Sequence, residues 1–288
     1  MSAPEPGIRV WTVAFRYDII CATMSADSQV RFNTGAEAWT DYNLKPLGRI
    51  RQEVTWNNLS PHLPDMTVLD YAPRVLDVGS GSGELALCLA QQGYGVWLTD
   101  YAPAMLDQAR QAAQDLPAGV RARLTFCPMS VEEASEAFAP HFFDAITCHT
   151  LIEFLPDPQS SLKALVSLLR DGGLLSVSFV NQRAEVLRQI WSNTDPWAAM
   201  EGLEKGSFCA NLFGVSGVAY TAEEVSTWLR ALGLSIDGFY GIRVFADYVP
   251  RERLDESEFF DALLQLEKAI AARRPYNELA RYVQLVAR

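Results

Sequence analysis

The chain has 288 residues, of which 49% are hydrophobic and 20% charged, and its formal net charge is −11. This composition excludes a disordered or fibrous protein, and no run approaches the roughly 18–20 apolar residues that a membrane-spanning helix needs. The acidic balance also argues against nucleic acid as a default partner, so any basic binding site must be local.

Residues 1–27 are predicted to form an extension without fixed structure, and the pattern leaves open whether the first 23 belong to the native protein. Residues 28–72 contain a helical pattern at about 47–63, ahead of the first strand. They are predicted to form a helical cover on or over one edge of the sheet. Residues 73–288 are expected to form the main domain.

From residue 73 onward, short β-rich runs alternate with helical segments. Strands are predicted at 74–78, 95–100, 123–127, 143–148 and 174–180, and helices at 84–92, 103–114, 131–138 and 158–169, the last closed by Asp171-Gly172-Gly173. Strands that are apolar on both faces and alternate with helices form parallel sheets covered on both sides, with right-handed crossovers. The pattern therefore predicts an α/β fold with a doubly wound, Rossmann-like sheet.

Residues 181–220 stand outside this alternation, because they lack strong periodicity and carry Trp191, Trp197, Phe208 and Phe213 among Gly, Asn and Ser. An aromatic insertion of this length between a strand and the next helix is typical of a lid or substrate pocket, and a small satellite core is the alternative. A helix at 221–232, a long β-rich run at 236–248, a helix at 256–273 and a last strand at 281–287 follow.

Five cysteines lie far apart in the sequence, namely Cys21, Cys88, Cys127, Cys148 and Cys209. They form no Cys-x-x-Cys pair and no His/Cys cluster with the spacing of zinc ligands. Charged residues (Arg9, Arg16 and Asp18) interrupt the apolar run that a secretory signal would need. We therefore expect reduced thiols in a cytoplasmic protein that binds no metal.

The strongest chemical signal lies between the first strand and the first helix, in the run Asp77-Val78-Gly79-Ser80-Gly81-Ser82-Gly83-Glu84. Glycines at alternate positions allow positive φ and let a ligand approach the backbone with no Cβ in the way. The run is not the G-x-G-x-x-G dinucleotide pattern, because Glu84 takes the third glycine's place, which disfavours a nicotinamide oxidoreductase. Asp100 ends the second strand, where an acid can bind a ribose diol.

An acid, a glycine turn and a second acid, each at the carboxyl end of its strand, resemble the class I S-adenosylmethionine-dependent methyltransferases. The resemblance implies a seven-stranded sheet, mostly parallel with an antiparallel last strand, and S-adenosylmethionine as the cofactor. It also implies that Val131 and Glu132 flank the adenine and that the fourth strand ends at the transfer site. His149 is then expected to contact cofactor or substrate, although a lone histidine at a strand end is often only structural.

Further runs from about residue 29 to the end resemble a narrower family, the bacterial tRNA 5-carboxymethoxyuridine methyltransferases. These runs are Arg51-Gln52 ahead of Trp56-Asn57-Asn58-Leu59, 149–154 with Asp157-Pro158, Phe179-Val180-Asn181, 241–248, Pro275-Tyr276 and Arg281-Tyr282-Val283. That family esterifies the carboxylate of a modified wobble uridine. The resemblance therefore implies the same reaction here, with tRNA as the partner.

Carried over residue by residue, the resemblance implies that Arg51 pairs with the methionine carboxylate of the cofactor and that Asp100 holds the ribose. Gly79 and Ser80 would contact the methionine moiety through the backbone. A guanidinium at Arg51 also makes independent sense, because it binds a carboxylate bidentately. The complete predicted cofactor-binding set is Arg51, Asp77, Gly79, Ser80, Gly81, Gly83, Asp100, Val131, Glu132 and His149.

The expected reaction needs no general base, because the sulfonium methyl is activated and a carboxylate acceptor is ionised at neutral pH. Positioning and the exclusion of water would supply the catalysis. An anionic acceptor requires a cation, for which Arg243 is the first candidate and Arg183 the second. Tyr248 and Tyr276 could hydrogen-bond or stack a splayed-out base. His149, Arg243 and Tyr248 form the predicted catalytic set. For Arg243 and Tyr248 the alternative is a buried Arg–Asp pair with Asp247 that fixes the strand end.

The insertion departs from that family, in which it carries a run of lysines. Here residues 181–220 hold three basic residues, Arg183, Arg188 and Lys205, against four acidic ones, Glu185, Asp195, Glu201 and Glu204. A C-terminal group of arginines (Arg251, Arg253, Arg273 and Arg274) could bind phosphates instead, or it could be a solvated face. A small-molecule methyltransferase therefore stays open as an alternative, and so does a non-catalytic cofactor-binding protein. The oligomeric state also stays open.

Overall fold

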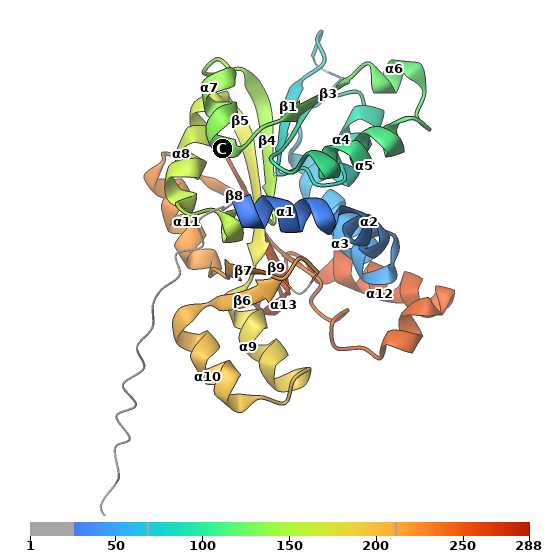
Figure 1. Ribbon diagram of the computed structural model, residues 1–288, viewed down its shortest axis with the longest axis vertical. Helices are drawn as coiled ribbons and strands as arrows, with labels where there is room; N and C mark the ends of the chain where they lie inside the picture. Colours follow the sequence, from blue (N-terminus) through green and yellow to red (C-terminus); the bar gives the residue numbers. More distant parts are fainter. Residues whose placement is uncertain (1–25, 68, 211) are drawn as a thin grey trace, which may run out of the picture.

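Figure 1 shows a computed structural model that describes residues 26–67, 69–210 and 212–288. The predicted N-terminal extension covers residues 1–27, of which residues 1–25 lie outside the described residues. The helices are α1 (Ala26–Thr34), α2 (Ala36–Leu44), α3 (Pro46–Leu59), α4 (Glu84–Gln91), α5 (Pro103–Ala113), α6 (Ala118–Arg121), α7 (Val131–Ala137), α8 (Pro158–Leu168), α9 (Gln182–Trp191), α10 (Pro196–Lys205), α11 (Ala222–Ala231), α12 (Ser257–Ile270) and α13 (Tyr276–Leu279). Three short 3-10 helices are η1 (Ser60–His62), η2 (Ile152–Phe154) and η3 (Arg251–Asp255).

A seven-stranded sheet with the order β3-β2-β1-β4-β5-β9-β8 forms the centre of the molecule. Its strands are β1 (Arg74–Val78), β2 (Gly95–Asp100), β3 (Leu124–Pro128), β4 (Phe143–His149), β5 (Leu169–Val180), β8 (Ile236–Ile242) and β9 (Tyr282–Ala287). The first five pair in parallel, and β9 runs antiparallel to both β5 and β8. The predicted sheet, doubly wound and mostly parallel with an antiparallel last strand, is confirmed.

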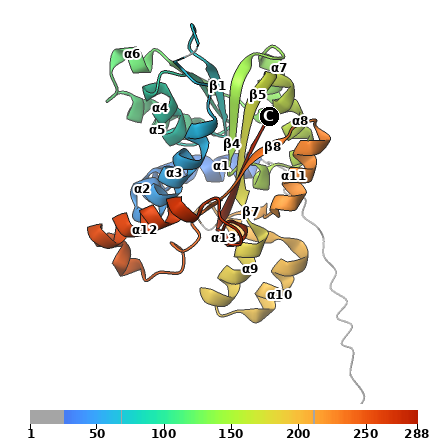
Figure 2. The same cartoon turned by 180° about the vertical axis from the view of Figure 1, so that it is seen from behind.

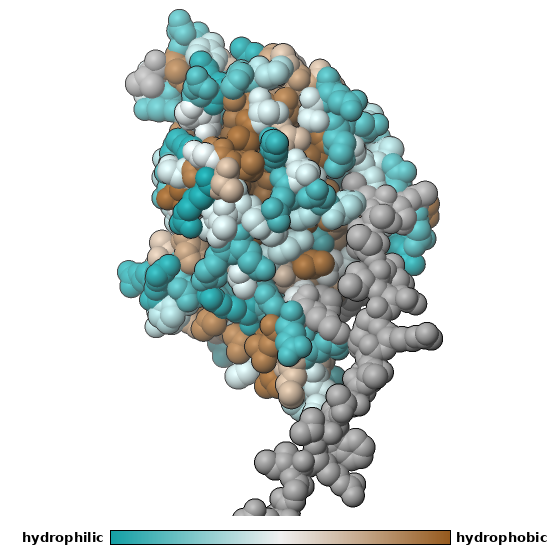
Figure 3. All heavy atoms as spheres, turned by 90° about the vertical axis from the view of Figure 1, so that its left-hand side faces the viewer, coloured by the Kyte–Doolittle hydropathy of each residue, from teal (hydrophilic) through white to brown (hydrophobic). Residues whose placement is uncertain are grey.

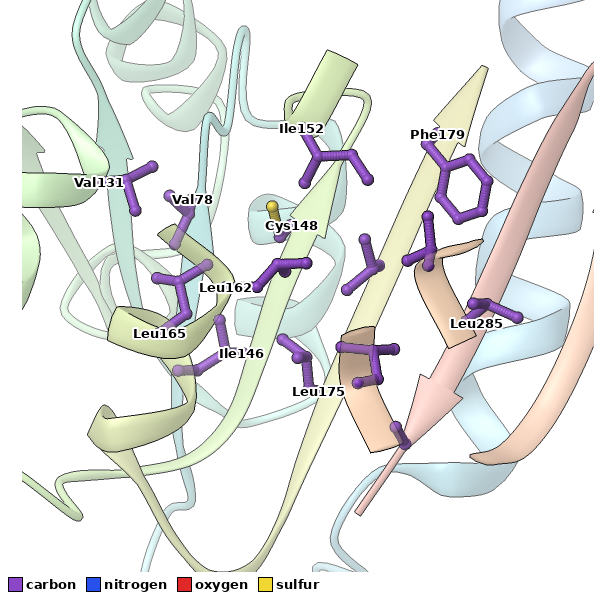
Figure 4. Close-up of a cluster of buried hydrophobic side chains, with 14 of the residues drawn as sticks. Val78, Val131, Ile146, Cys148, Ile152, Leu162, Leu165, Leu175, Phe179 and Leu285 are labelled. Atoms are coloured by element: carbon purple, nitrogen blue, oxygen red, sulfur yellow. The ribbon is translucent and has the colours of Figure 1, made fainter. Parts of the chain in front are cut away.

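Helices cover both faces of the sheet. Successive side chains of a strand point to opposite faces, so each strand contributes to a core on either side. On one face, Leu76 and Val78 of β1 join a core with side chains of α8 and α11, part of which Figure 4 shows. On the other face, Val75 packs with residues of α3, α4 and α5. Figure 2 shows the same two layers from behind.

The N-terminal helices cross the carboxyl ends of the strands. Pro46 begins α3 at a position where its missing N–H costs nothing, and the helix packs its apolar side against the sheet. The helix predicted at about 47–63 corresponds to α3, which begins at Pro46 and ends at Leu59. Asn33 of α1 accepts a hydrogen bond from the N–H of Ala104, at the start of α5 (3.0 Å). Figure 1 shows α1 lying across the end of the sheet that faces the insertion.

The predicted end of the fourth helix at Asp171-Gly172-Gly173 is wrong. Helix α8 ends at Leu168, and Leu169 already pairs with Phe143 in the sheet. The register then jumps so that Leu174 faces Ala145, which leaves residues 170–173 as a bulge within β5. Gly172 takes φ +71° in this bulge, so the glycines serve the bend of a strand and not a helix end.

The insertion consists of α9 and α10 followed by a two-stranded hairpin, β6 (Ser207–Ala210) and β7 (Val215–Val218). Asn181 and Asp195 begin the two helices by accepting hydrogen bonds from backbone N–H groups of the first turn. Both helices leave large apolar side chains exposed at helical spacing: Trp191 on α9 is 66% exposed and Trp197 on α10 78%. Figure 3 shows hydrophobic residues at the surface in the lower part of the molecule, where Figure 1 places α9 and α10.

The β-rich run predicted at 236–248 ends earlier, at Ile242. Arg243 takes φ +61°, which turns the chain away from the sheet. The buried carboxylate of Glu267 on α12 then accepts hydrogen bonds from the N–H groups of Val244, Phe245 and Ala246, at 2.7–2.8 Å. These N–H groups are thus satisfied outside any strand pairing.

Candidate functional site

A cavity of about 550 Å³ lies at the carboxyl ends of the central strands. Its wall combines the glycine turn, the ends of β2, β4 and β8, the N-terminal helices and the β6–β7 hairpin. Of the residues predicted to form the site, Arg51, Asp77, Gly79, Ser80, Gly81, Asp100, Val131, His149 and Arg243 line this cavity. Gly83, Glu132 and Tyr248 are not part of its wall.

Asp100 ties the glycine turn to the second strand. One oxygen of its carboxylate accepts the N–H of Gly81 (3.0 Å) and the other accepts the N–H of Ala102 (2.9 Å). The N–H of Ser80 donates to the carbonyl of Thr99 (2.9 Å). Gly79 and Gly81 have φ of +64° and +55°, which side chains with a Cβ rarely adopt. The turn therefore presents bare backbone to the cavity.

Arg51 reaches the cavity from α3. Its Nη2 donates to Oδ1 of Asn43 (2.8 Å), and its guanidinium carbon lies 4.5 Å from the centre of the Trp39 ring. None of the ion pairs among the described residues involves Arg51. This guanidinium is thus held in place and still has its charge available for an anionic ligand group.

Buried polar atoms without a hydrogen-bond partner gather around the cavity. Among the described residues they are Arg51 Nε, Ser80 Oγ, Tyr101 Oη, both carboxylate oxygens of Glu153 and, elsewhere, Asn277 Oδ1. The first four of these residues line the cavity. An unpaired buried polar atom costs roughly 1–3 kcal/mol, so this concentration indicates a site built for a polar ligand.

Buried acids dominate the end of the cavity next to the glycine turn. Burial raises the pKa of Asp77 to about 7, with the neighbouring Glu84 and Asp100 adding to it and a hydrogen bond from Thr147 opposing it. Burial also raises the pKa of Asp100 to about 6, against the two N–H groups that it accepts. Burial makes the ionisation of these carboxylates costly, and a ligand that carries positive charge would offset that cost.

His149 lines the cavity from the end of β4 and is held from behind. Its Nε2 lies 2.8 Å from Oγ of Ser176, which also accepts a hydrogen bond from Gln284 (3.1 Å). Asn58 of α3 donates to Gln284 in turn (3.2 Å). Burial, with Arg51 adding to it, lowers the pKa of His149 to about 3, so that its ring is neutral at neutral pH.

Aromatic side chains form the wall on the side of the N-terminal helices and the insertion. They are Phe32, Trp39, Tyr42, Tyr101, Phe154, Phe208 and Phe213. The ring of Phe32 lies 4.6 Å from Phe213 and 5.5 Å from Phe154 between centres, and Phe154 lies 6.0 Å from Phe208. Helix α1 and the β6–β7 hairpin therefore meet through aromatic contacts over the cavity.

The far end of the cavity is basic. Arg243, only 5% exposed, donates to the carboxylate of Asp247 and to Oη of Tyr42. The Tyr282 ring lies between two arginines, with the guanidinium carbons of Arg243 and Arg281 at 5.5 and 5.7 Å from its centre. Arg243 thus forms the buried Arg–Asp pair that the sequence offered as an alternative, and it still lines the cavity.

Arg281 and Arg188 both pair with Glu185, which is buried on α9. All three cations, Arg188, Arg243 and Arg281, are part of the cavity wall. Sequence reasoning did not single out Arg188 or assign a role to Arg281, although the Arg281-Tyr282 run was part of the resemblance. Arg188 and Glu185 are three residues apart on α9, and only the fold brings Arg281, directly before β9, to the same carboxylate.

The residues around the cavity hold no metal centre. Among the described residues there is no group of three His, Cys, Asp or Glu side chains that could hold a metal ion. Within the same part of the chain, no helix has both the length and the apolar character needed to cross a membrane.

Comparison with known proteins shows the family. A family model described as a methyltransferase domain matches residues 76–177. A tRNA 5-carboxymethoxyuridine methyltransferase of Escherichia coli (strain K12) is 32% identical over 244 residues, which span 84% of this chain and 88% of that protein. The chain belongs to the S-adenosylmethionine-dependent methyltransferases.

Other similar proteins belong to the same enzyme class. A ubiquinone biosynthesis O-methyltransferase of Xanthomonas axonopodis pv. citri (strain 306) is 32% identical over 217 residues, which span 74% of this chain and 82% of that protein. A solved S-adenosylmethionine-dependent methyltransferase of Thermotoga maritima, 17% identical, has a TM-score of 0.59 and covers 90% of this chain and 98% of its own. At this identity the structural likeness shows the fold alone. The chain is an enzyme, and the non-catalytic alternative is set aside.

For three predicted site residues of this methyltransferase the structure gives other surroundings. A Cβ on Gly83 would lie 2.8 Å from the Cβ of Ala109, so this glycine lets α4 and α5 pack closely. Glu132 is exposed, and its Oε1 accepts a hydrogen bond from Ser161 on α8 (3.3 Å). Tyr248 packs edge-on against Trp191 (5.6 Å between centres), outside the cavity wall.

Two secondary candidates of the sequence also lie outside the cavity wall of the methyltransferase. Arg183 pairs with Glu223 (3.0 Å) and Glu278 (3.4 Å), and Tyr276 packs against Phe245. Residues that line the wall but were missed include Phe32, Trp39 and Tyr42 on the N-terminal helices. Their only sequence signal is a cluster of aromatic residues in an otherwise polar segment.

The Asp77→Asn variant of the methyltransferase is expected to be more stable than the wild type at pH 8, by on the order of 2 kcal/mol. Because the folded protein raises the pKa of Asp77 above that of the unfolded chain, its contribution to stability is complete below about pH 4 and is lost as pH rises through about 7. Asn keeps an oxygen for Thr147 without the charge.

Urea unfolding of wild type and variant between pH 4 and 9 measures this difference. The two free energies of unfolding should converge at low pH, separate as pH rises from about 4 to about 7, and differ by a constant amount above that. The exposed Asp115→Asn variant is the matched control, and its stability should follow that of the wild type throughout. A constant offset between wild type and Asp77→Asn at every pH would contradict the prediction.

Proposed function

We propose that the protein transfers a methyl group from S-adenosylmethionine to the carboxylate of 5-carboxymethoxyuridine at the tRNA wobble position, forming the methyl ester. The observation that carries this proposal is the polarity of the cavity. Asp77 and Asp100 line it next to the glycine turn, and Arg188, Arg243 and Arg281, paired with Glu185 and Asp247, line it from other elements. A cationic donor would lie by the acids and an anionic acceptor by the arginines.

The residues at the acidic end fit S-adenosylmethionine. Arg51 would bind the methionine carboxylate, the backbone of Gly79 and Ser80 would contact the methionine moiety, and Asp100 would accept hydrogen bonds from the ribose hydroxyls. Val131 would pack on the adenine, because the capping box of Ser130 and Glu133 begins α7 at this point of the cavity wall. When bound, the cofactor supplies a methyl group activated by the positive sulfur.

The chain's own residues then have three tasks: holding the acceptor carboxylate, aligning it and excluding water. No residue needs to remove a proton, since the acceptor carboxylate is ionised at neutral pH. A neutral ring at His149 suits such a site, because it can contact the reactants without taking up a proton or adding a negative charge. The aromatic wall would keep the site dry, which strengthens the attraction between the arginines and the carboxylate.

The relative from E. coli supports tRNA as the substrate, and we accordingly propose a cytoplasmic location. Phosphate contacts would have to come from the arginines near the C-terminus. Of these, Arg253 pairs with Glu256 (2.8 Å) and Arg274 with Glu278 (3.3 Å), so only part of their charge is available. The aromatic wall and the relative from Xanthomonas favour a second candidate, a small-molecule O-methyltransferase.

The test uses purified protein, S-adenosylmethionine and tRNA that carries unesterified 5-carboxymethoxyuridine. Digestion to nucleosides and mass spectrometry should show a gain of one methyl group on that nucleoside. The same tRNA without the modification is the control and should gain none. Cofactor binding without product would rule out the tRNA reaction and favour the small-molecule acceptor.

A further inference from the structure

Glu153 is the buried charged group of the cavity that the proposed reaction leaves without a task. It belongs to η2, directly after β4, and is 2% exposed. Neither of its carboxylate oxygens has a partner at good hydrogen-bond geometry among the described residues, and the N–H groups of Glu153 and Val180 lie near them. The residue nevertheless lines the cavity, as do His149 and Phe154.

Charged and titratable groups face Glu153 from several elements. Arg51 of α3 and Arg281, directly before β9, attract its charge, and Cys148 of β4 and Tyr220, ahead of α11, interact with it electrostatically. Burial outweighs the two arginines and the nearby N–H groups of Glu153 and Val180, and it raises the pKa of Glu153 to about 8. At neutral pH the side chain is therefore mainly a neutral carboxylic acid.

The surroundings of Glu153 suit a planar group. Phe154 follows it in the sequence, and Phe208 of the hairpin lies 6.0 Å from Phe154 between ring centres. Gly217 of β7 packs so closely that a Cβ there would lie 3.1 Å from the carbonyl oxygen of Glu153 and 2.9 Å from the Phe208 ring. The insertion thus covers Glu153 directly and closes the aromatic wall around it.

A neutral carboxylic acid presents one hydrogen-bond donor and one acceptor side by side. The imide edge of a uracil ring presents the complementary pair, an N–H and a carbonyl oxygen. We propose that the side chain of Glu153 binds the imide edge of the acceptor's pyrimidine base and thereby selects that base. This inference rests on the proposed function, because it assigns an edge of the same acceptor. Arg188, Arg243 and Arg281 would hold the carboxylate of the base's side chain.

The test compares two ligands on the complex of the protein with S-adenosylhomocysteine. Isothermal titration calorimetry measures the binding of the free nucleoside 5-carboxymethoxyuridine and of its N3-methyl derivative, which lacks the imide N–H. The wild type should bind the first at least ten times more tightly than the second. Equal affinities, or binding of neither nucleoside, would overturn the inference without any mutation.

Two variants separate recognition from a structural role. Glu153→Gln keeps a donor and an acceptor side by side without a titratable proton, so its affinity at pH 7 should stay within about threefold of the wild type. Between pH 7 and 9 the wild type should lose affinity relative to Glu153→Gln, because an ionised carboxylate cannot donate to the carbonyl. Glu153→Ala should bind at least ten times more weakly and should not discriminate against the N3-methyl group.

The cofactor provides the control for these variants. Affinity for S-adenosylhomocysteine should be unchanged in Glu153→Gln, and a parallel loss of cofactor affinity would assign Glu153 to the cofactor and overturn the inference. Parallel pH profiles of the wild type and Glu153→Gln would overturn it as well. Failure of the tRNA reaction is a separate result: the wild type could discriminate between the nucleosides and still not esterify the tRNA, which would refute the proposed function alone.

Discussion

Replacement of Asp100 by alanine is expected to weaken the binding of S-adenosylmethionine at least 100-fold. The variant loses the carboxylate that would bind the ribose hydroxyls, and hydrogen bonds to a charged group contribute roughly 1.5–3 kcal/mol each. It also frees the N–H groups of Gly81 and Ala102, which the carboxylate accepts at 3.0 and 2.9 Å. The shape of the glycine turn and the contact with the ribose therefore fail together.

Isothermal titration calorimetry with S-adenosylhomocysteine measures this loss, and thermal unfolding checks that the variant is folded. The exposed Asp115→Ala variant should bind like the wild type. The ribose hydroxyls would donate to the ionised carboxylate of Asp100, and burial raises the pKa of Asp100 to about 6 in the protein without ligand. Wild-type affinity should therefore fall as the pH drops below 6. Binding of the cofactor to Asp100→Ala at near wild-type strength would refute the assignment of the cofactor site.

Replacement of Arg243 by methionine is expected to lower the free energy of unfolding by roughly 3–5 kcal/mol, as breaking a buried ion pair does. The loss arises because Asp247, whose side chain is 15% exposed in the cavity wall, keeps its charge with only the more distant Arg251 (3.9 Å) as a partner. Tyr42, 201 residues away in sequence, loses its hydrogen bond from the same guanidinium. Methyl transfer to an anionic acceptor should fall below detection in the same variant.

A double variant, Arg243→Met with Asp247→Leu, separates the two roles of this pair. Apolar side chains in place of both partners should restore most of the stability, because no unpaired charge is left. Methyl transfer should remain absent, since the cation for the acceptor is still missing. Urea unfolding and the nucleoside assay measure the two quantities, with the exposed Arg230→Met as control. Recovery of activity together with stability would show that Arg243 only fixes the end of β8.

The sequence by itself determined the sheet and most of the cavity wall next to the glycine turn. Both depend on short-range patterns: apolar runs at strand spacing, and a glycine turn whose acids stand at the ends of β1 and β2. Such patterns survive without knowledge of the fold, because neighbouring parallel strands bring their carboxyl ends to one edge. The glycine spacing did not reveal that Gly83 serves helix packing, because Ala109 contacts it from another helix.

The part of the cavity wall formed by aromatic side chains and arginines was decided only by the tertiary structure. Phe32 and Phe213, Tyr42 and Arg243, and Glu185 and Arg281 meet across 96–201 residues of sequence. No periodicity records such contacts, because each partner sits in a helix or loop whose local pattern is satisfied without it. Tyr248 illustrates this. It belongs to the same run as Arg243, so the sequence predicted both at the site. The positive φ at Arg243 and the three N–H groups bound by Glu267 turn Tyr248 out of the cavity wall. Glu153 is the opposite case. In the sequence it looks like an ordinary buried acid, and only the three-dimensional structure sets it apart, because its carboxylate lacks a well-placed hydrogen-bond partner.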